Sequence, residues 1–393
     1  MKFMFCPMGT QGFVYPAIGL ALELRLRGHE VAFATSPAFT PLLEQVGLER
    51  IPRGDKDGLS FLVERWIHPV EVALQYKHLE YALKRFPADV LVGTPLTLGP
   101  YLMREVKGIP LAVLGMAPYL WPLTDAPPLE KTETEQWQWW RYEDMMRHLN
   151  RAREMLRAAP VHGSPRDSPL LGDLFLLRSV PELAGPETAL PSRVHLVGGC
   201  LWEPPALETE LEEWLRRGDS EAPLLYVQHG RSFEGPRFWS QLVESLAHQR
   251  VRVVATTSRM EEQPGALPAG FYVREVLPQG QVMARAAGLI ASATTSAVLG
   301  ALTQGLPSVL LPSGGEQPDL AAQVARVGAG LCVPAAQASP RVLGEAVERL
   351  LGDPDLGSSA RRLRRAFEQM DSPGHALRLL EHLGGTGHAP SRP

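Results

Sequence analysis

Side chains that could bind a phosphate follow predicted buried strands at several places in this sequence. Residues 9–16 read GTQGFVYP, and Gly12 is the candidate contact there because the helix that follows offers free N–H groups. Residues 228–235 read QHGRSFEG, where Arg231 and Ser232 could donate hydrogen bonds to a phosphate. The alternative interpretation of the second stretch is a solvated loop.

A third candidate site combines two further stretches. Residues 291–302, ASATTSAVLGAL, join a predicted strand to a predicted helix, whose N-terminus would attract an anion. Hydroxyl donors stand at that junction, namely Thr294, Thr295 and Ser296. In residues 312–319, PSGGEQPD, a glycine turn precedes Glu316 and Gln317, which could receive sugar hydroxyls. The alternatives are that the hydroxyls only cap the first helix and that Glu316 only offsets the dipole of the second.

Short predicted strands alternate with helices in both halves of the chain. In the first half, strands are predicted over residues 2–8, 31–36, 88–94 and 110–116, with helices over 15–30, 37–47 and 97–107. In the second half, strands are predicted over residues 223–231, 251–257, 271–277, 288–292, 307–312 and 330–333, with helices over 234–248, 279–287, 295–304, 316–327, 341–351 and 355–370. This alternation predicts an α/β fold of two doubly wound domains, with a ligand cleft at the carboxyl ends of both sheets.

Residues 118–165 interrupt the alternation with a long predicted helix over 132–159. That helix carries an aromatic cluster of Trp137, Trp139, Trp140 and Tyr142. Aromatic side chains dominate cores and interfaces, so helix packing is one explanation. The alternative is an apolar wall for a bulky ligand.

The composition excludes several classes of function. The chain has 393 residues, enough for two domains of ~150–200 residues. Its formal net charge of -4 gives no reason to expect nucleic acid or an anionic membrane as a partner. Three cysteines without metal-ligand spacing predict no metal site and a reduced, cytoplasmic setting. We find no signal-peptide pattern and no run of ~18 apolar residues, so we expect no membrane segment.

The candidate stretches resemble the signatures of one enzyme superfamily. Residues 9–39 are similar to the opening G-x-x-G-H-V-x-P…RGHEV of the UDP-glycosyltransferase-like enzymes. Residues 273–330 resemble their donor-binding signature, which contains HHGGAGTxLxAL followed by G-x-P and an Asp-Gln pair. The resemblance runs nearly end to end and looks closest to bacterial enzymes that glycosylate antibiotics and other natural products. It implies the GT-B fold of two facing Rossmann-like domains.

The resemblance also implies which substrate each domain binds. Residues 1–203 would bind the acceptor, residues 204–372 would bind the nucleotide-sugar donor, and a helix over 373–383 would pack back on the first domain. Residues 384–393 are predicted to be a disordered tail. The expected co-substrate is a UDP- or TDP-type sugar, with no further cofactor and no metal. The expected partners are this sugar and a small-molecule acceptor, and a homodimer is compatible with the pattern.

The sequence departs from the family signatures at positions that the family uses for catalysis and phosphate binding. The family's general-base histidine corresponds to Phe13, which cannot take a proton. Its diphosphate-contacting histidine corresponds to Ser292, and the two glycines after it correspond to Ala293 and Thr294. The Asp of its Asp-Gln pair corresponds to Glu316. The donor-binding residues that we expect are Gly12, Arg231, Ser232, Ser292, Ala293, Thr294, Thr295, Ser296, Glu316 and Gln317.

Two residues of the first domain could replace the missing base: Asp125, after the strand over 110–116, and His68. A surface loop position is the alternative for both. A phenol, an amine or a nucleophilic carbon would need less help from a base than an alkyl alcohol does. The acceptor-binding residues that we expect are Phe13, Trp66, Met116, Tyr119, Trp121 and Trp140.

The expected activity is an inverting, metal-independent transfer of a sugar from a nucleotide-diphosphate sugar to a small natural product. The alternative is a catalytically degenerate or repurposed homologue, which would act as a partner or binding protein or catalyse a different reaction.

Overall fold

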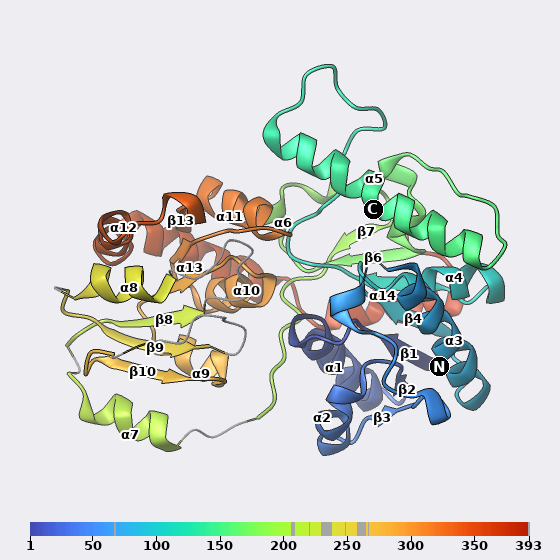
Figure 1. The fold of residues 1–393 in the computed structure, drawn as a ribbon, viewed down its shortest axis with the longest axis horizontal. Coiled ribbons are helices and arrows are strands. Elements are labelled where there is room, and N and C mark those ends of the chain that lie inside the picture. Colours follow the sequence, from blue (N-terminus) through green and yellow to red (C-terminus); the bar gives the residue numbers. More distant parts are fainter. Residues whose placement is uncertain are drawn as a thin grey trace. The chain divides into compact units, whose positions relative to one another are not determined.

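A computed structural model describes residues 1–66, 68–205, 209–219, 221–228, 238–247, 249–257, 265 and 267–391. The chain divides into two compact units. The first unit comprises residues 1–202 and 370–393, and the second comprises residues 203–369. Each unit is built around its own parallel sheet (Figure 1).

The first unit contains a seven-stranded sheet in the order β3-β2-β1-β4-β5-β6-β7. Its strands are β1 (Lys2–Cys6), β2 (Glu30–Phe33), β3 (Glu49–Arg50), β4 (Val90–Gly93), β5 (Leu111–Leu114), β6 (Leu174–Leu177) and β7 (Val194–Leu196). Its helices are α1 (Gln11–Leu26), α2 (Thr40–Gln45), α3 (Pro69–Arg85), α4 (Leu98–Lys107), α5 (Glu133–Met155), α6 (Pro181–Ala184) and α14 (Gly374–Thr386). The sequence did not predict β6, a run of only four apolar residues.

Helices cover both faces of this sheet, because the apolar side chains of β1 alternate between two clusters. Phe3 and Phe5 face the cluster that contains residues of α1 and α14. Met4 and Cys6 face the cluster that contains residues of α3, α4 and α5. Each fully buried side chain of this size contributes roughly 1.5–3 kcal/mol. Because the strand pairs of this sheet are parallel, the strands end at the same edge, and the loops before α1, α3 and α4 follow that edge.

The first helix begins earlier than the sequence predicted. We expected a loop over residues 9–16 because Pro16 fits the first turn of a helix, but α1 begins at Gln11. Proline has no N–H, so its place inside α1 deprives the Gly12 carbonyl of its usual helical donor. The guanidinium of Arg178 contacts that carbonyl instead. A partner far away in the sequence thus lowers the cost of the proline.

The predicted disordered tail is wrong at its start, because α14 continues through residue 386. Its glycines had suggested flexibility, but Gly384 serves close packing. A Cβ at Gly384 would lie 2.6 Å from the sulfur of Met1 and 3.2 Å from Val90 Cγ2. The helix ends at Gly387, whose φ of 77° is the left-handed conformation that favours glycine.

The second unit contains a six-stranded sheet in the order β10-β9-β8-β11-β12-β13. Its strands are β8 (Leu224–Gln228), β9 (Arg252–Thr256), β10 (Phe271–Arg274), β11 (Gly288–Ala291), β12 (Ser308–Leu310) and β13 (Gly330–Cys332). Its helices are α7 (Thr209–Arg217), α8 (Phe238–Leu246), α9 (Gln279–Met283), α10 (Thr295–Gln304), α11 (Gln317–Arg326), α12 (Pro340–Gly352) and α13 (Pro354–Gln369). Every strand pairing that the structure describes in either sheet is parallel.

Short 3-10 turns connect some of these elements. They span Pro37–Phe39, Gly54–Lys56, Val63–Arg65, Pro165–Asp167, Pro169–Leu171, Glu187–Ala189 and Ala335–Gln337. None of the helices that the structure describes combines the length and apolar character that a bilayer crossing requires.

Candidate functional site

The candidate site in the first unit lies at the start of α1, beyond the carboxyl end of β1. Gly9 has no room for a side chain, because a Cβ there would lie 2.5 Å from Ser36 Cβ and 2.7 Å from the Phe61 carbonyl oxygen. The Gly9 N–H donates to that oxygen at 3.0 Å. Phe13 follows in the first turn and is half-buried. It packs against the cluster that contains residues of α3, α4 and α5, called the α3–α5 cluster below. The position that the resemblance gives to a base therefore holds an apolar ring on a tightly packed turn.

Arg178 brings a positive charge to this turn. It follows β6, and its Nη1 lies 3.5 Å from the Gly12 carbonyl oxygen while its Nε donates to the Gly199 carbonyl at 3.0 Å. The side chain is 2% exposed, and burial lowers its pKa to about 10. The guanidinium therefore stays protonated near neutral pH. The sequence analysis missed Arg178, and the signal that could have found it is a basic residue directly after an apolar run.

A buried carboxylate on α3 holds the segment that packs on Gly9. Glu71 is fully buried, and its Oε1 accepts hydrogen bonds from the backbone N–H groups of Phe61 at 2.5 Å and Leu62 at 3.3 Å. Phe61 has a φ of 63°, which non-glycine residues rarely adopt. Because Phe61 also accepts from Gly9, the Glu71 carboxylate reaches the start of α1 through a single residue. Burial raises the pKa of the Glu71 carboxyl.

Two further buried polar residues extend this row along α3. Gln75 donates from Nε2 to the Glu71 carboxylate at 3.1 Å. His78 lies between the Ser60 hydroxyl and the Ile51 carbonyl, at 2.8 and 2.7 Å. Burial lowers the pKa of the His78 imidazole, which favours its neutral form. Polar residues at helical spacing in an otherwise buried face were the overlooked signal.

Three of the expected acceptor residues follow β5 and are buried together with core aromatics. Met116, Tyr119 and Trp121 belong to the α3–α5 cluster. The Tyr119 ring meets Phe175 edge-to-face at 6.2 Å, and the Trp121 ring meets Tyr142 at the same distance. The hydroxyl of Tyr119 and the indole nitrogen of Trp121 are buried and have no hydrogen-bond partner among the described residues. Two polar atoms in an apolar wall are the kind of groups that orient a ligand.

The aromatic cluster of α5 points to two different sides of the helix. The buried side carries Trp139 and Tyr142. Trp137 and Trp140 are each 54% exposed and pack edge-to-face on one another at 5.7 Å. Trp140 therefore lies on the exposed side of α5, whereas the other expected acceptor tryptophan of this region, Trp121, is buried. Trp66 is half-buried and packs edge-to-face on His148 at 6.3 Å.

The two residues proposed as substitute bases are both exposed. His68 is the N-cap of α3, where its Nδ1 accepts from the Val70 N–H at 3.2 Å. Asp125 lies between β5 and α5 in a stretch that is exposed over residues 123–127, and the loop before α5 extends away from the sheet at the top of Figure 1. Within the described part of the chain, no hydrogen bond or ion pair joins either side chain to the start of α1.

In the second unit, the junction after β11 is buried and strained. Ser292 and Ala293 are 0% exposed. Ala293 has a φ of 61°, the left-handed conformation that favours glycine and costs an alanine roughly 1 kcal/mol. The backbone thus keeps the conformation of a glycine at a position where the resemblance expects one.

The start of α10 carries hydroxyl groups beyond this junction. Thr294 is the half-buried N-cap, but its side chain makes no capping hydrogen bond to the helix. Thr295 is 6% exposed, and Ser296 is half-buried. The Ser296 carbonyl accepts from Gln279 Nε2 at 3.0 Å, which ties α9 to the first turn of α10. The alternative, in which Thr294 only caps the helix, is therefore not supported by a capping hydrogen bond.

Glu316 and Gln317 start α11 as predicted, but they differ in accessibility. Glu316 is the half-buried N-cap. Gln317 is 3% exposed, and its Oε1 accepts from the backbone N–H and the hydroxyl of Ser313 at 2.9 and 3.2 Å. The amide oxygen of Gln317 thus fixes the turn before α11.

Arg231 and Ser232 belong to residues 229–237, which lie outside the described residues. Gln228, directly before them, ends β8 beside Ala291 of β11 and Thr256 of β9. Its position places an amide side chain at the same edge of the sheet as the β11–α10 junction.

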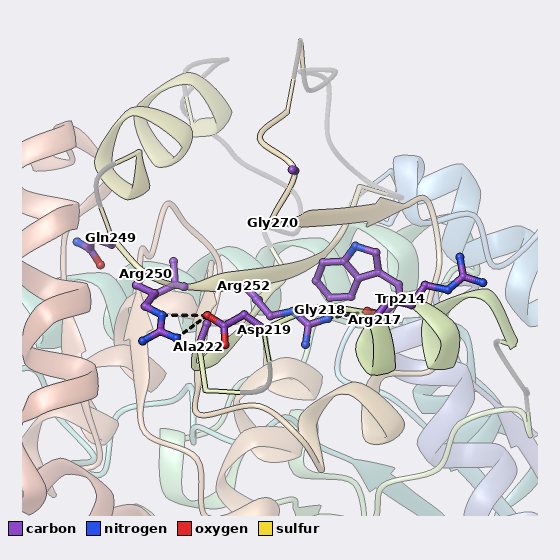
Figure 2. A pocket seen from close by; sticks show the side chains of 11 residues that line it. Trp214, Arg217, Gly218, Asp219, Ala222, Gln249, Arg250, Arg252 and Gly270 are labelled. Atoms are coloured by element: carbon purple, nitrogen blue, oxygen red, sulfur yellow. Dashed lines mark hydrogen bonds and ion pairs between the residues drawn. The ribbon is translucent and has the colours of Figure 1, made fainter.

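The second unit also contains a cavity of about 420 Å³ at the opposite edge of its sheet (Figure 2). Arg252 lines it, donates to the Trp214 carbonyl at 2.7 Å and lies 4.2 Å above that indole ring. Arg250 pairs with Asp219 at 2.8 Å. These contacts anchor the end of α7 and the start of β9. Because the strands are parallel, this amino-terminal edge is remote from Ser292, so we do not assign the donor to this cavity.

Proteins of similar sequence and fold support the GT-B resemblance. The chain is 26% identical to the 4'-demethylrebeccamycin synthase of Lentzea aerocolonigenes, over 95% of this chain and 97% of that one. It is 28% identical to the O-mycaminosyltylonolide 6-deoxyallosyltransferase of Streptomyces fradiae, over 98% of each. The solved structure of the spinosyn forosaminyltransferase SpnP matches with a TM-score of 0.76 and 18% identity, over 98% of this chain and 99% of that one.

Two family models match separate parts of the chain. The glycosyltransferase family 28 N-terminal domain matches residues 3–100. The erythromycin biosynthesis protein CIII-like C-terminal domain matches residues 240–383. The chain thus carries regions that match a glycosyltransferase N-terminal domain and an antibiotic-biosynthesis C-terminal domain, and its fold is similar to that of the solved glycosyltransferase SpnP. The β11–α10 junction lies within the second matched region.

Each unit thus contains its own candidate site, and the two are described separately. The candidate site of the first unit is the start of α1 with Phe13 and Arg178, and that of the second unit is the start of α10 with Thr294. Nowhere in the described ranges do three or more His, Cys, Asp or Glu side chains gather in a way that could hold a metal ion.

Proposed function

We propose that this chain transfers a sugar from a nucleotide-diphosphate sugar to a small natural-product acceptor, with inversion and without a metal ion. The observation that carries the proposal is the β11–α10 junction, which sits inside the matched C-terminal domain model. A parallel strand there leads into a ten-residue helix whose N-cap Thr294 side chain makes no capping hydrogen bond. Helix N-termini that follow parallel strands are sites where phosphates bind.

The mechanism follows from the charge that develops on the donor. When the bond between the sugar C1 and the diphosphate oxygen breaks, negative charge grows on the diphosphate. The N-terminus of α10 supplies about half a positive charge and free N–H groups for it. The Thr294 hydroxyl adds a donor. Fixed dipoles of this kind stabilise a leaving group without reorganisation, and attack from the opposite face inverts the anomeric centre.

Nucleotide binding tests the donor half of the proposal. Calorimetry with UDP and TDP should detect binding, and Thr294→Val should weaken it about tenfold or more, because a hydrogen bond to a charged group is lost. Thr303→Val is the matched control, since Thr303 lies near the other end of α10 and donates to the Gly300 carbonyl at 3.0 Å. Equal weakening by both variants, or no binding of either nucleotide at millimolar concentration, would refute the assignment.

Product mass and stereochemistry test the transfer itself. A phenolic acceptor incubated with UDP-glucose or TDP-glucose should gain the mass of one hexose. An α-configured donor should give a β-glycoside in the proton spectrum, and a metal chelator should not lower the rate. A retained configuration would reject the inverting mechanism, and a loss of rate with the chelator would reject the metal-independent one.

Two observations favour a second candidate, a degenerate homologue that binds a ligand or a partner but transfers no sugar. Phe13 offers no proton acceptor, and Ser292 is fully buried where the resemblance expects a phosphate contact. Nucleotide binding without a mass gain on any acceptor would favour this candidate. The cytoplasmic location and the homodimer stay predictions from the sequence.

A further inference from the structure

Among the described residues, no acidic side chain pairs with the buried charge of Arg178. Its Nη2 is buried and has no hydrogen-bond partner in the part of the chain that the structure describes. The neighbouring Ser179 hydroxyl is also fully buried and without a described partner. Burying a charge without a paired charge is costly, so such groups are commonly matched by an anion.

The groups around Arg178 leave its positive charge uncompensated. The titratable group that faces it is the Cys200 thiol, and burial raises the pKa of that thiol, so the thiol is neutral. The Ser372 hydroxyl, which contacts Cys200 at 3.4 Å, carries no charge either. The carbonyls of Gly12 and Gly199 contribute only partial negative charge.

The charge lies beside the N-terminus of a long helix. Arg178 contacts the carbonyl of Gly12, the second residue of the sixteen-residue α1, and Phe13 is the next residue. The N-cap Thr10 makes no side-chain hydrogen bond to this helix. The helix N-terminus and the guanidinium therefore favour an anion at the same turn. The resemblance implies a general base at this turn, and this chain has the phenyl ring of Phe13 there.

We infer that Arg178 and the N-terminus of α1 hold the acceptor as an oxyanion, so that this chain glycosylates acidic hydroxyls such as phenols in preference to alkyl alcohols. The inference rests on the proposed glycosyl transfer and names its acceptor class. The hydroxyl loses its proton to water, and the resulting oxygen lone pair forms the bond to the sugar C1. The bond from C1 to the diphosphate breaks, and the nucleoside diphosphate leaves with the electron pair. No protein base is consumed in this sequence.

An acceptor series tests the inference on the unmodified chain. Substituted phenols from nitrophenols to alkylphenols are compared with benzyl alcohol at one donor concentration, and kcat/KM is measured from product mass. We expect benzyl alcohol to react at least about 100-fold more slowly than phenols, the lower range of what a general base supplies. For weakly acidic phenols the rate should rise with pH as the ionised fraction rises. Comparable rates for benzyl alcohol and phenols would overturn the inference.

Variants of Arg178 separate charge from position. Arg178→Gln keeps donors for the neighbouring carbonyls but removes the charge, and Arg178→Lys keeps the charge. Arg178→Gln should lower kcat/KM about tenfold or more for weakly acidic phenols, shift their pH profile upward and affect nitrophenols less. Arg178→Lys should restore part of the loss. A uniform loss for all acceptors with an unchanged pH profile would show that Arg178 only positions α1.

Arg193→Gln is the matched control, because Arg193 precedes β7 at the other edge of the sheet, where it contacts the Gly172 carbonyl at 3.0 Å. It should leave the acceptor series unchanged. If Arg178→Gln does not fold, the acceptor series on the unmodified chain still decides. If alkyl alcohols react as fast as phenols, the inference fails and the proposed function stands. If no acceptor gains a sugar, both fail.

Discussion

At the scale of single residues, Ala293 and Glu71 show that packed neighbours enforce conformations which the residues themselves disfavour. Ala293 is held at a positive φ between β11 and α10. Glu71 keeps a carboxylate fully buried and uses it to hold Phe61, another residue at positive φ. Each group lies at the carboxyl edge of its sheet, where the candidate site is built.

Ala293→Gly should stabilise the second unit by about 0.5–1 kcal/mol, because relief of the left-handed strain exceeds the entropy that glycine adds to the unfolded chain. Urea denaturation measures this change. Ala297→Gly is the control: Ala297 is fully buried inside α10, and glycine there should cost about 1 kcal/mol or more. If both variants destabilise the unit equally, the strain assigned to Ala293 is absent.

Replacement of Glu71 should change how stability depends on pH. Burial raises the pKa of its carboxyl above the ordinary 4.5, so the folded chain binds this proton more tightly than the unfolded chain does. The stability that this group contributes is therefore present below pH 4.5 and is lost as the pH rises through the raised pKa. Glu71→Gln removes this titration. Relative to the unmodified chain, the Glu71→Gln variant should become more stable between about pH 4 and about pH 8.

Glu71→Ala provides the contrast to that experiment. It leaves the N–H groups of Phe61 and Leu62 without their acceptor, so it should cost about 3 kcal/mol near pH 4 and less near pH 8, because it also removes the titration. Urea denaturation at both pH values measures the two variants. A stability difference between the Glu71→Gln variant and the unmodified chain that does not change with pH would contradict a buried carboxyl with a raised pKa.

At the scale of elements, α3 and α4 approach each other closely through a glycine. A Cβ at Gly99 would lie 3.0 Å from the backbone carbon of Gln75 and 3.0 Å from the backbone nitrogen of Tyr76. The Gly99 N–H also donates to the Gln75 side chain at 3.0 Å. This contact fixes α4 against the same polar row that holds Phe61. The spacing between these two helices thus belongs to the support of the candidate site.

Gly99→Ala should destabilise the first unit by about 1–3 kcal/mol, because overpacking against backbone outweighs the better helix propensity of alanine. The control is Gly385→Ala in α14, where no atom lies within 4 Å of the added Cβ among the described residues. That variant should be neutral or gain up to about 1 kcal/mol. Thermal unfolding compares the two, and a neutral Gly99→Ala would mean that the helices can separate freely.

The elements also show what sequence patterns can and cannot predict. The predicted helix over 295–304 has those bounds as α10, because a buried strand precedes it and Gly305 ends it at a φ of 73°. The start of α1 was predicted four residues late, since the donor that compensates Pro16 comes from Arg178. Local signals such as periodicity and caps are present in the sequence, whereas compensation by a distant side chain is not.

The residues of the candidate sites also fall into two groups, those that local patterns predict and those that they do not. The β11–α10 junction and the start of α11 could be predicted from motifs, because each is one continuous stretch. Arg178 and Glu71 could not, since their roles depend on burial against segments distant in the sequence. The buried and exposed aromatics of α5 could have been separated by applying the 3.6-residue period to the cluster.

At the scale of the whole molecule, the first unit contains both ends of the chain. The leucines of α14 join the cluster that Phe3 and Phe5 face, and Glu381 pairs with His29 at 3.0 Å. The second unit, residues 203–369, is thus inserted between two parts of the first. A substitution that weakens the packing of α14 should therefore destabilise the strands near the beginning of the chain.

Leu380→Ala should destabilise the first unit by about 2–5 kcal/mol, because it opens a cavity at a fully buried position of α14. Hydrogen exchange should accelerate in β1 and β4 and not in β8 or β11. Leu363→Ala in α13, 1% exposed, is the matched control and should accelerate exchange in the second unit instead. Faster exchange in β8 after Leu380→Ala would contradict the division into units.

The insertion sets an order of events during synthesis. When the ribosome has made residues 1–202, α1 can cover the face of the sheet that it shares with α14, but the part that α14 covers is still exposed, and Met1 has no Gly384 to pack on. Residues 203–369 emerge next and have all of their own strands and helices. We therefore expect the second unit to fold first. The first unit should complete its fold last, after α14 has left the exit tunnel.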